Sequence, residues 1–173
     1  MLLTSQEGSV ATVTINRPEV LNMLTHELIL RLTEEIQRWS AEKAVRVIIV
    51  AGSGEKAFVG GVDVKALMDP DWAERLVTDL HRCFLAVRQS EKLIIASVNG
   101  FALGAGLQLV ASCDVRITSD RARFGMPEVW VGIPRGHRSG HPSPPDRPWA
   151  CCRDGLPGGS GRRPRSLGNR AGQ

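Results

Sequence analysis

The chain has 173 residues and a formal net charge of +4, and 42% of its residues are hydrophobic against 23% charged. This composition is typical of one globular domain and excludes disordered and fibrous proteins. No run approaches the roughly 20 consecutive apolar residues of a membrane span, and the N-terminus lacks the plan of a secretory signal, so we expect a cytoplasmic protein.

The first half of the chain alternates predicted strands and helices. Residues 8–15 alternate in the pattern of a strand that ends before Pro18. Thr25 is placed to cap a helix, and the unbroken β-branched run 45–51 predicts a strand covered on both faces. The buried side of the helix is predicted from spacings of four, four and three residues, at Leu28, Leu32, Ile36 and Trp39.

The alternation continues beyond residue 69. Asp69 and Pro70 form an N-cap followed by proline at the first helical position, and residues 93–99 resemble another buried strand. The helix between them has an apolar stripe at Leu76, Leu80, Phe84 and Val87. Strands and helices at this spacing predict an α/β fold with right-handed crossovers.

Residues 135–173 differ sharply from the rest of the chain. They contain eight arginines and two aspartates, so this tail carries a charge of +6 and residues 1–134 carry −2. Apolar periodicity stops at Pro134, and we expect the Arg, Pro and Gly-rich tail to be disordered. A basic arm for nucleic acid or acidic membranes is the functional alternative, but the tail has no lysine and only Trp149 as an aromatic residue.

Two glycine-rich turns follow predicted strands and carry the functional prediction. In the first, residues 56–64, consecutive glycines permit positive φ, so that the amide of Val62 can face inward. The second, Gly104-Ala105-Gly106, opens an apolar helix whose unpaired N–H groups can point at a ligand oxygen. Two such donors are what a thioester oxyanion needs. Phosphate-binding loops are excluded because position 109 is leucine and no Gly-Lys-Ser or Gly-Lys-Thr occurs.

The side chains around these turns offer one acid. Glu128 follows Pro127 inside a mostly apolar run, and an acid in such surroundings is suited to proton transfer, although a surface role is the alternative. Gln108 lies one helical turn beyond Ala105 and can hydrogen-bond water or a substrate oxygen, but glutamine is not a useful proton acceptor. His26 and His81 fall on polar helix faces, which predicts a solvated role.

From about Val10 to Pro134 the chain resembles the crotonase superfamily, the enoyl-CoA hydratase and isomerase family. Five motifs occur in the family's order, namely NRPE with the following Leu21-Asn22, AFVGGVDV, NGFALGAGLQL, the aspartate of CDVRI, and FGMPEVWVGIP. The resemblance implies a core of repeated ββα units, a coenzyme A thioester as substrate, and no metal or redox cofactor. It divides the chain into a crotonase-like core at 1–134, without the family's C-terminal helical region, and the tail at 135–173.

The resemblance also implies roles for individual residues. The amides of Val62 and Ala105 would form an oxyanion hole that stabilises an enolate, with Glu128 and Gln108 as the catalytic side chains. The coenzyme A path and the substrate site would involve Val20, Met23, Ala57, Phe58, Gly61, Asp63, Val64 and Gly104. Family members are homotrimers or dimers of trimers. The implied partner is an acyl-CoA small molecule, and neither nucleic acid nor a membrane is expected.

Two departures from the family pattern leave alternatives open. Hydratases of this kind use two glutamates, and here Gln108 stands at the first position while Glu128 is retained. A single acid can still move a double bond, so a hydratase, a single-acid isomerase or another crotonase-type reaction, and an inactive truncated product all remain. The tail lacks the family's later helices, and its composition is typical of GC-rich DNA read out of frame. We therefore expect a frameshift close to Arg135, in the gene or in its sequence record.

Overall fold

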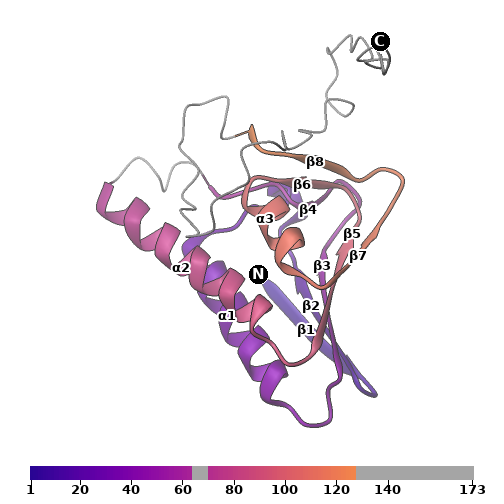
Figure 1. The fold of residues 1–173 in the computed structure, drawn as a ribbon. Coiled ribbons are helices and arrows are strands. Elements are labelled where there is room, and N and C mark those ends of the chain that lie inside the picture. The colour runs from indigo at the N-terminus through magenta and orange to yellow at the C-terminus, as the bar shows by residue number, and fades with distance from the viewer. Residues whose placement is uncertain (64–69, 128–173) are drawn as a thin grey trace, which may run out of the picture. The chain divides into compact units, whose positions relative to one another are not determined.

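The computed structural model of the chain describes residues 1–63 and 70–127. Three strand-strand-helix units follow one another and are succeeded by two further strands, so the predicted repetition of ββα units is present (Figure 1). The elements are β1 (Leu2–Glu7), β2 (Val10–Ile15), the 3-10 turn η1 (Pro18–Val20), α1 (His26–Ala41), β3 (Val47–Gly52), β4 (Ala57–Val59), α2 (Pro70–Arg88), β5 (Leu93–Val98), β6 (Phe101–Leu103), α3 (Ala105–Ser112), β7 (Val115–Thr118) and β8 (Arg123–Gly125).

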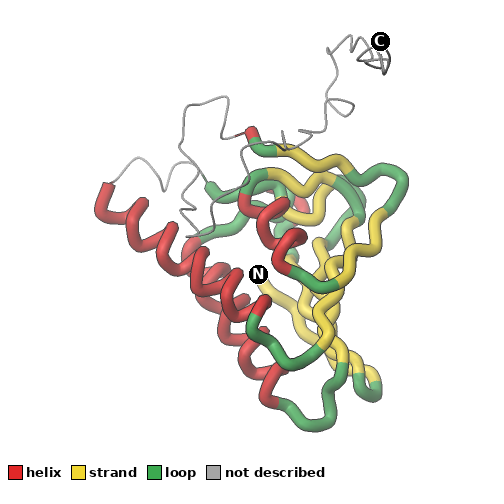
Figure 2. Tube along the Cα trace, in the orientation of Figure 1, coloured by secondary structure: helices red, strands yellow, loops and turns green. Residues whose placement is uncertain are grey.

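The strands form two sheets, drawn in yellow in Figure 2. The long sheet has the order β1-β2-β3-β5-β7, in which β1 and β2 are antiparallel and the other neighbours are parallel. The short sheet has the order β4-β6-β8 and is entirely parallel. From the second unit onward, therefore, the first strand of each pair joins the long sheet and the second strand joins the short one.

The two long helices pack against each other and bury the predicted residues. In α1 the whole apolar side, from Leu28 to Trp39, is buried, and the hydroxyl of Thr25 accepts a hydrogen bond from the Leu28 amide at 3.3 Å, as the predicted cap requires. In α2, which begins at Pro70, Leu76, Phe84 and Val87 are buried and Leu80 is partly so. Helical periodicity thus predicted both packing faces correctly.

One strand was not predicted, and one prediction about a strand is wrong. Residues 2–7 form β1, which the sequence analysis did not predict and which pairs with β2 across a turn at Gly8, where φ is +56°. Within the described residues, strand β3 buries one face fully and the other only in part, because burial alternates along it and Ile49 is half-buried. The same second face is open at the edge strand β7, where 59% of Ile117 is exposed. A β-branched run reports the preference for a strand, whereas coverage depends on which elements pack against it.

Some predictions fall outside the part of the chain that the structure describes. The Asp69 cap and the tail at 135–173 are among them. Cys83 and Cys113 are buried free thiols. Among residues 1–63 and 70–127, no helix combines the length and apolar character needed to cross a membrane, and no group of three His, Cys, Asp or Glu side chains is arranged to hold a metal ion.

Candidate active site

The short sheet brings the two predicted glycine-rich turns to one edge. Its three strands are parallel, so their carboxyl ends meet there, and this is where ligands bind in many open α/β sheets. The turn after β4 contains Gly60 and Gly61, and the turn after β6 contains Gly104. The amide of Gly104 also donates to the Gly125 carbonyl at the end of β8, at 2.9 Å. Three segments far apart in sequence therefore converge at this edge.

The first turn is held on its outer side by the segment 21–24. The Gly60 amide donates to the carbonyl of Leu21 at 2.8 Å. Leu24 then forms a parallel bridge around Val62: its amide donates to the Gly61 carbonyl at 2.8 Å, and its carbonyl accepts from the Asp63 amide at 3.1 Å. In such a bridge the central residue directs its own N–H and C=O to the opposite side. The amide of Val62 therefore points away from Leu24.

The side to which the Val62 amide points is occupied by β6 and the start of α3. Strand β6 is the neighbour of β4 on that side, and a Cβ built on Gly61 would lie 3.6 Å from the carbonyl oxygen of Leu103. Gly61 has φ +117°, a conformation that residues with side chains rarely adopt. The backbone path of the first turn thus depends on a glycine and on the bonds to Leu24, and the part that the Val62 amide plays in a site stays a prediction.

The second turn leads directly into α3. Gly104, with φ +53°, occupies the N-cap position without a side-chain cap, so Ala105 is the first residue of the helix. The first amides of a helix have no acceptor within it and carry the positive end of the helix dipole. A Cβ added at Gly106 would overlap the carbonyl oxygen of Val59, so the first turn of α3 rests on the backbone of β4. Glycine allows this close approach.

A buried asparagine missed in the sequence analysis as a site residue ties these segments together. Asn22 is fully buried, and its Nδ2 donates to the carbonyl of Ser53 at 2.9 Å and to that of Ala57 at 2.8 Å. Its Oδ1 accepts from the amide of Arg17 at 2.8 Å. The Arg17 guanidinium donates to the carbonyl of Met23 at 2.7 Å. The only sequence signal was an amide side chain in the NRPE motif region, without periodicity to show its partners.

The other predicted site residues are distributed as follows. Gln108 is half-buried in α3, and its backbone N–H donates to the Gly104 carbonyl at 3.1 Å. Val20 and Met23 are half-buried beside the Leu21 turn. Ala57 and Phe58 belong to the core, with exposures of 2% and 0%, so neither residue offers an open surface to a ligand in the described part of the chain. Glu128 and Val64 lie outside the described residues.

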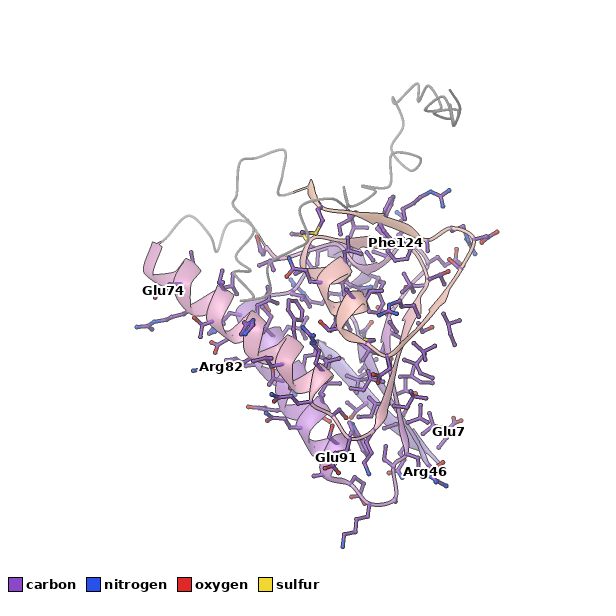
Figure 3. The ribbon with its side chains drawn as sticks, in the orientation of Figure 1. Glu7, Arg46, Glu74, Arg82, Glu91 and Phe124 are labelled. Atoms are coloured by element: carbon purple, nitrogen blue, oxygen red, sulfur yellow. The ribbon has the colours of Figure 1, made fainter. Side chains whose placement is uncertain are left out.

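A hydrogen-bonded histidine–aspartate pair near the start of α1 corrects one prediction. His26 was predicted to be solvated, but its Nε2 lies 2.7 Å from Oδ2 of Asp79 in α2, and the two side chains are only 18% and 14% exposed. The hydrogen bond from His26 lowers the pKa of Asp79 below its usual value, with Arg82 adding to the effect. Because His26 is the first residue of α1 and Asp79 lies in α2, the His26–Asp79 pair joins the two long helices. Figure 3 shows Glu74 and Arg82 projecting from α2 away from the sheets.

The fold and this edge define a class of protein: an α/β chain of repeated ββα units in which two glycine-rich turns face one another at the end of a short parallel sheet. Residues 5–138 match the family model described as enoyl-CoA hydratase/isomerase. The chain belongs to the enoyl-CoA hydratase/isomerase family, as the five motifs predicted.

Named relatives and solved structures agree with this assignment. The chain is 39% identical to the short-chain-enoyl-CoA hydratase of Clostridium acetobutylicum over 137 residues, covering 78% of this chain and 52% of that protein. It is 33% identical to the 2,3-dehydroadipyl-CoA hydratase of Escherichia coli over 135 residues, with coverage of 78% and 52%. The crystal structure of an enoyl-CoA hydratase/carnithine racemase from Magnetospirillum magneticum superposes with a TM-score of 0.75 at 28% identity, covering 79% of this chain and 52% of that one. The chain spans about half the length of the curated relatives it matches.

Proposed function

We propose that this protein acts on acyl-CoA thioesters as an enoyl-CoA hydratase/isomerase-like enzyme. The observation that carries the proposal is the convergence of the turn at Gly60–Asp63 with the start of α3, each offering a backbone amide. In the proposed site the amides of Val62 and Ala105 hold the thioester oxygen and stabilise the enolate that forms when a proton is exchanged at the neighbouring carbon. Preorganised amide donors of this kind contribute about 10²–10³ in rate each.

Glu128 is proposed as the group that moves the proton, on the strength of its motif position. In hydration of a 2-enoyl-CoA, a water oxygen adds to C3 and a proton is delivered to C2. In isomerisation of a 3-enoyl-CoA, a single carboxylate takes a proton from C2 and, once protonated, returns one at C4, so that the double bond moves into conjugation. Gln108 stands at the first of the two positions where hydratases of the family have a glutamate, and this residue favours the isomerase-type reaction as the second candidate.

The remaining residues of the site are proposed to position the ligand. Val20 and Met23 stand next to the Leu21 turn, and Ala57 and Phe58 lie in β4, directly before the turn at Gly60–Asp63. Together with Gly61, Asp63, Val64 and Gly104 they are proposed to line the path of the coenzyme A moiety. No metal or redox cofactor takes part in the proposed reaction, and assembly into trimers is proposed from the resemblance to the family.

The proposal is tested by mixing the purified full chain with a 2-enoyl-CoA and, separately, with a 3-enoyl-CoA. Loss of the conjugated thioester absorbance in the first mixture indicates a hydratase, and its appearance in the second indicates an isomerase. A Glu128→Gln variant is expected to lose activity in whichever assay responds. Full activity of that variant would remove Glu128 from its role, and failure of the wild-type chain to bind or convert either thioester would contradict the proposal.

The contribution of Ala105 is separable by a proline substitution. Ala105 is the first residue of α3, where proline is tolerated because that N–H has no acceptor within the helix. Ala105→Pro therefore removes the proposed amide donor while leaving the intrahelical bonds. We expect kcat to fall about 10²–10³-fold, with an unchanged circular dichroism spectrum. Wild-type kcat in a folded Ala105→Pro variant would show that this amide stabilises no charge.

A further inference from the structure

Asn22 stands out as a polar side chain with 0% exposure in the described residues, among otherwise apolar buried residues. Its amide group spans a gap of more than 30 residues in sequence, because it donates to the carbonyls of Ser53 and Ala57. Its oxygen accepts from the Arg17 amide and, at 3.4 Å, from the hydroxyl of Ser53. A buried amide with all these partners is costly to replace, because each partner would lose its own bond.

The backbone at this position is also unusual. Leu21 and Asn22 both have φ +55°, and they are the two described non-glycine residues in the left-handed region. Such a conformation is unfavourable for residues with a side chain and persists only where the surroundings impose it. Here the backbone N–H of Asn22 donates to the Arg17 carbonyl at 2.8 Å. The side chain is held at both ends, because its oxygen accepts from Arg17 and its nitrogen donates to Ala57. The side-chain bonds of Asn22 thus hold the segment 21–24 in its shape.

That segment is the one that holds the first glycine-rich turn. The carbonyl of Leu21 accepts from Gly60, and Leu24 bonds to Gly61 and Asp63 on either side of Val62. The bond from Asn22 to Ala57 fixes the beginning of β4, and the bonds of Leu21 and Leu24 fix the residues after it. Asn22 therefore acts on the turn from both ends without touching Val62.

We propose that Asn22 is a positioning residue, whose buried hydrogen bonds to residues 17, 53 and 57 set the orientation of the Val62 amide. The consequence for catalysis rests on the proposed function, whereas the consequence for the turn does not. Asn22 contacts neither substrate nor the reacting atoms in this proposal. It keeps the donor preorganised, which is the property that makes such amides effective.

The test compares three variants of the full chain by hydrogen exchange and by kinetics. Asn22→Gly keeps the left-handed backbone without strain and deletes the side chain. Asn22→Asp keeps the acceptor oxygen but removes the donor to Ser53 and Ala57. Ser40→Ala is the control, because Ser40 also makes two part-buried hydrogen bonds, to Ile36 and Ser90, far from the turn in sequence.

In Asn22→Gly we expect the hydrogen-bonded amides of Gly60, Leu24 and Asp63 to exchange at least about tenfold faster, with protection in β3 and β5 unchanged. Asn22→Asp is expected to lose the same protection at pH 7 and to regain part of it, relative to wild type at equal pH, when the acid is protonated and donates again. In kinetics, kcat should fall by a larger factor than the affinity for a saturated acyl-CoA, because Asn22 is proposed to act on the Val62 donor as well as on the segment that includes Met23. Ser40→Ala should show none of these effects.

The outcomes separate this proposal from the proposed function. If the wild-type chain converts neither thioester, the proposed function fails, and the exchange experiment still decides the role of Asn22. Unchanged exchange at Gly60 and Asp63 in both variants would overturn the positioning proposal. So would a loss of protection spread evenly over β3 and β5, or unfolding of both variants, because Asn22 would then serve global stability alone.

Discussion

At the scale of single residues, Gly106 shows how a local preference is overruled by a contact. Helix propensity favours alanine over glycine by about 1 kcal/mol, so Gly106→Ala would stabilise an isolated helix. In the structure the added Cβ would overlap the Val59 carbonyl and lie 2.8 Å from the Val59 Cβ. We expect Gly106→Ala to lower the free energy of unfolding by about 1–3 kcal/mol, because β4 and α3 must move apart.

Urea denaturation of Gly106→Ala and of a second variant in the same helix measures this effect. Ala111 is exposed in α3, and Ala111→Gly is expected to cost about 1 kcal/mol through propensity alone. Both exchanges should therefore destabilise, although they are opposite in kind. A stabilised Gly106→Ala variant would show that α3 does not rest on β4 as described.

At the scale of elements, the pair His26–Asp79 connects α1 with α2. The pKa of Asp79 is lowered first by its hydrogen bond to His26, so the folded state holds the carboxylate form more strongly than the unfolded state does. The stability it contributes is present above the unfolded pKa of about 3.8 and is lost as the pH falls below that value. Asp79→Asn should cost about 0.5–1 kcal/mol at pH 7, a value discounted for the nearby solvent.

The measurement is the free energy of unfolding of wild type and Asp79→Asn between pH 7 and pH 3. The difference between them is expected to shrink as the pH approaches 3. Glu35→Gln is the matched control, because Glu35 pairs with Arg38 within α1 and the Arg38 side chain is 60% exposed. A constant difference over the whole pH range would show that the charge of Asp79 contributes nothing to the contact of the two helices.

Elements also show how far local sequence carries. The helix from His26 to Ala41 is specified by its apolar stripe and its Thr25 cap, both of which lie within the segment itself. Strand β1 has no such mark, since only Leu2 of its six residues is buried and its pairing with β2 provides the order. The partial exposure of the second face of β3 was missed for the same reason, because the elements that cover a strand are not part of its own sequence.

At the scale of the whole molecule, two buried thiols make the folded state sensitive to alkaline pH. Burial raises the pKa of Cys83 to about 11 and that of Cys113 to about 12, from a usual 9.0. In the unfolded chain both ionise near pH 9.0, while the folded protein keeps them protonated. Stability is therefore full below pH 9 and is lost progressively as the pH rises toward 11–12.

This prediction is checked by unfolding the protein at pH 8 and pH 10, with Cys83→Ala and Cys113→Ala as comparisons. The difference between the two pH values should be smaller in each variant than in wild type. The native thiols should also react slowly with a disulfide reagent at pH 8 when Cys151 and Cys152 are replaced by serine. Rapid labelling of both remaining thiols would contradict their burial.

Figure 3 shows the two ends of the long sheet: Glu7 and Arg46 lie at one end, and Phe124 of β8 lies with the short sheet at the other.

The sequence alone determined the features whose causes are local: the α/β alternation, the buried faces and cap of the helices, and the two glycine-rich turns that must approach a backbone or ligand closely. Its motifs also predicted the family correctly. The roles of Val62, Ala105, Gln108 and Glu128 stay predictions.

Only the tertiary structure decided how these local features meet. The division of strands between two sheets, the burial of Asn22, and the pairing of His26 with Asp79 across 53 positions join residues distant in the chain. Periodicity shows which side of an element is buried, but it does not show which partner covers that side. The partner is chosen when the whole chain forms its hydrogen bonds and fills its core, because most buried polar groups must find partners at the same time.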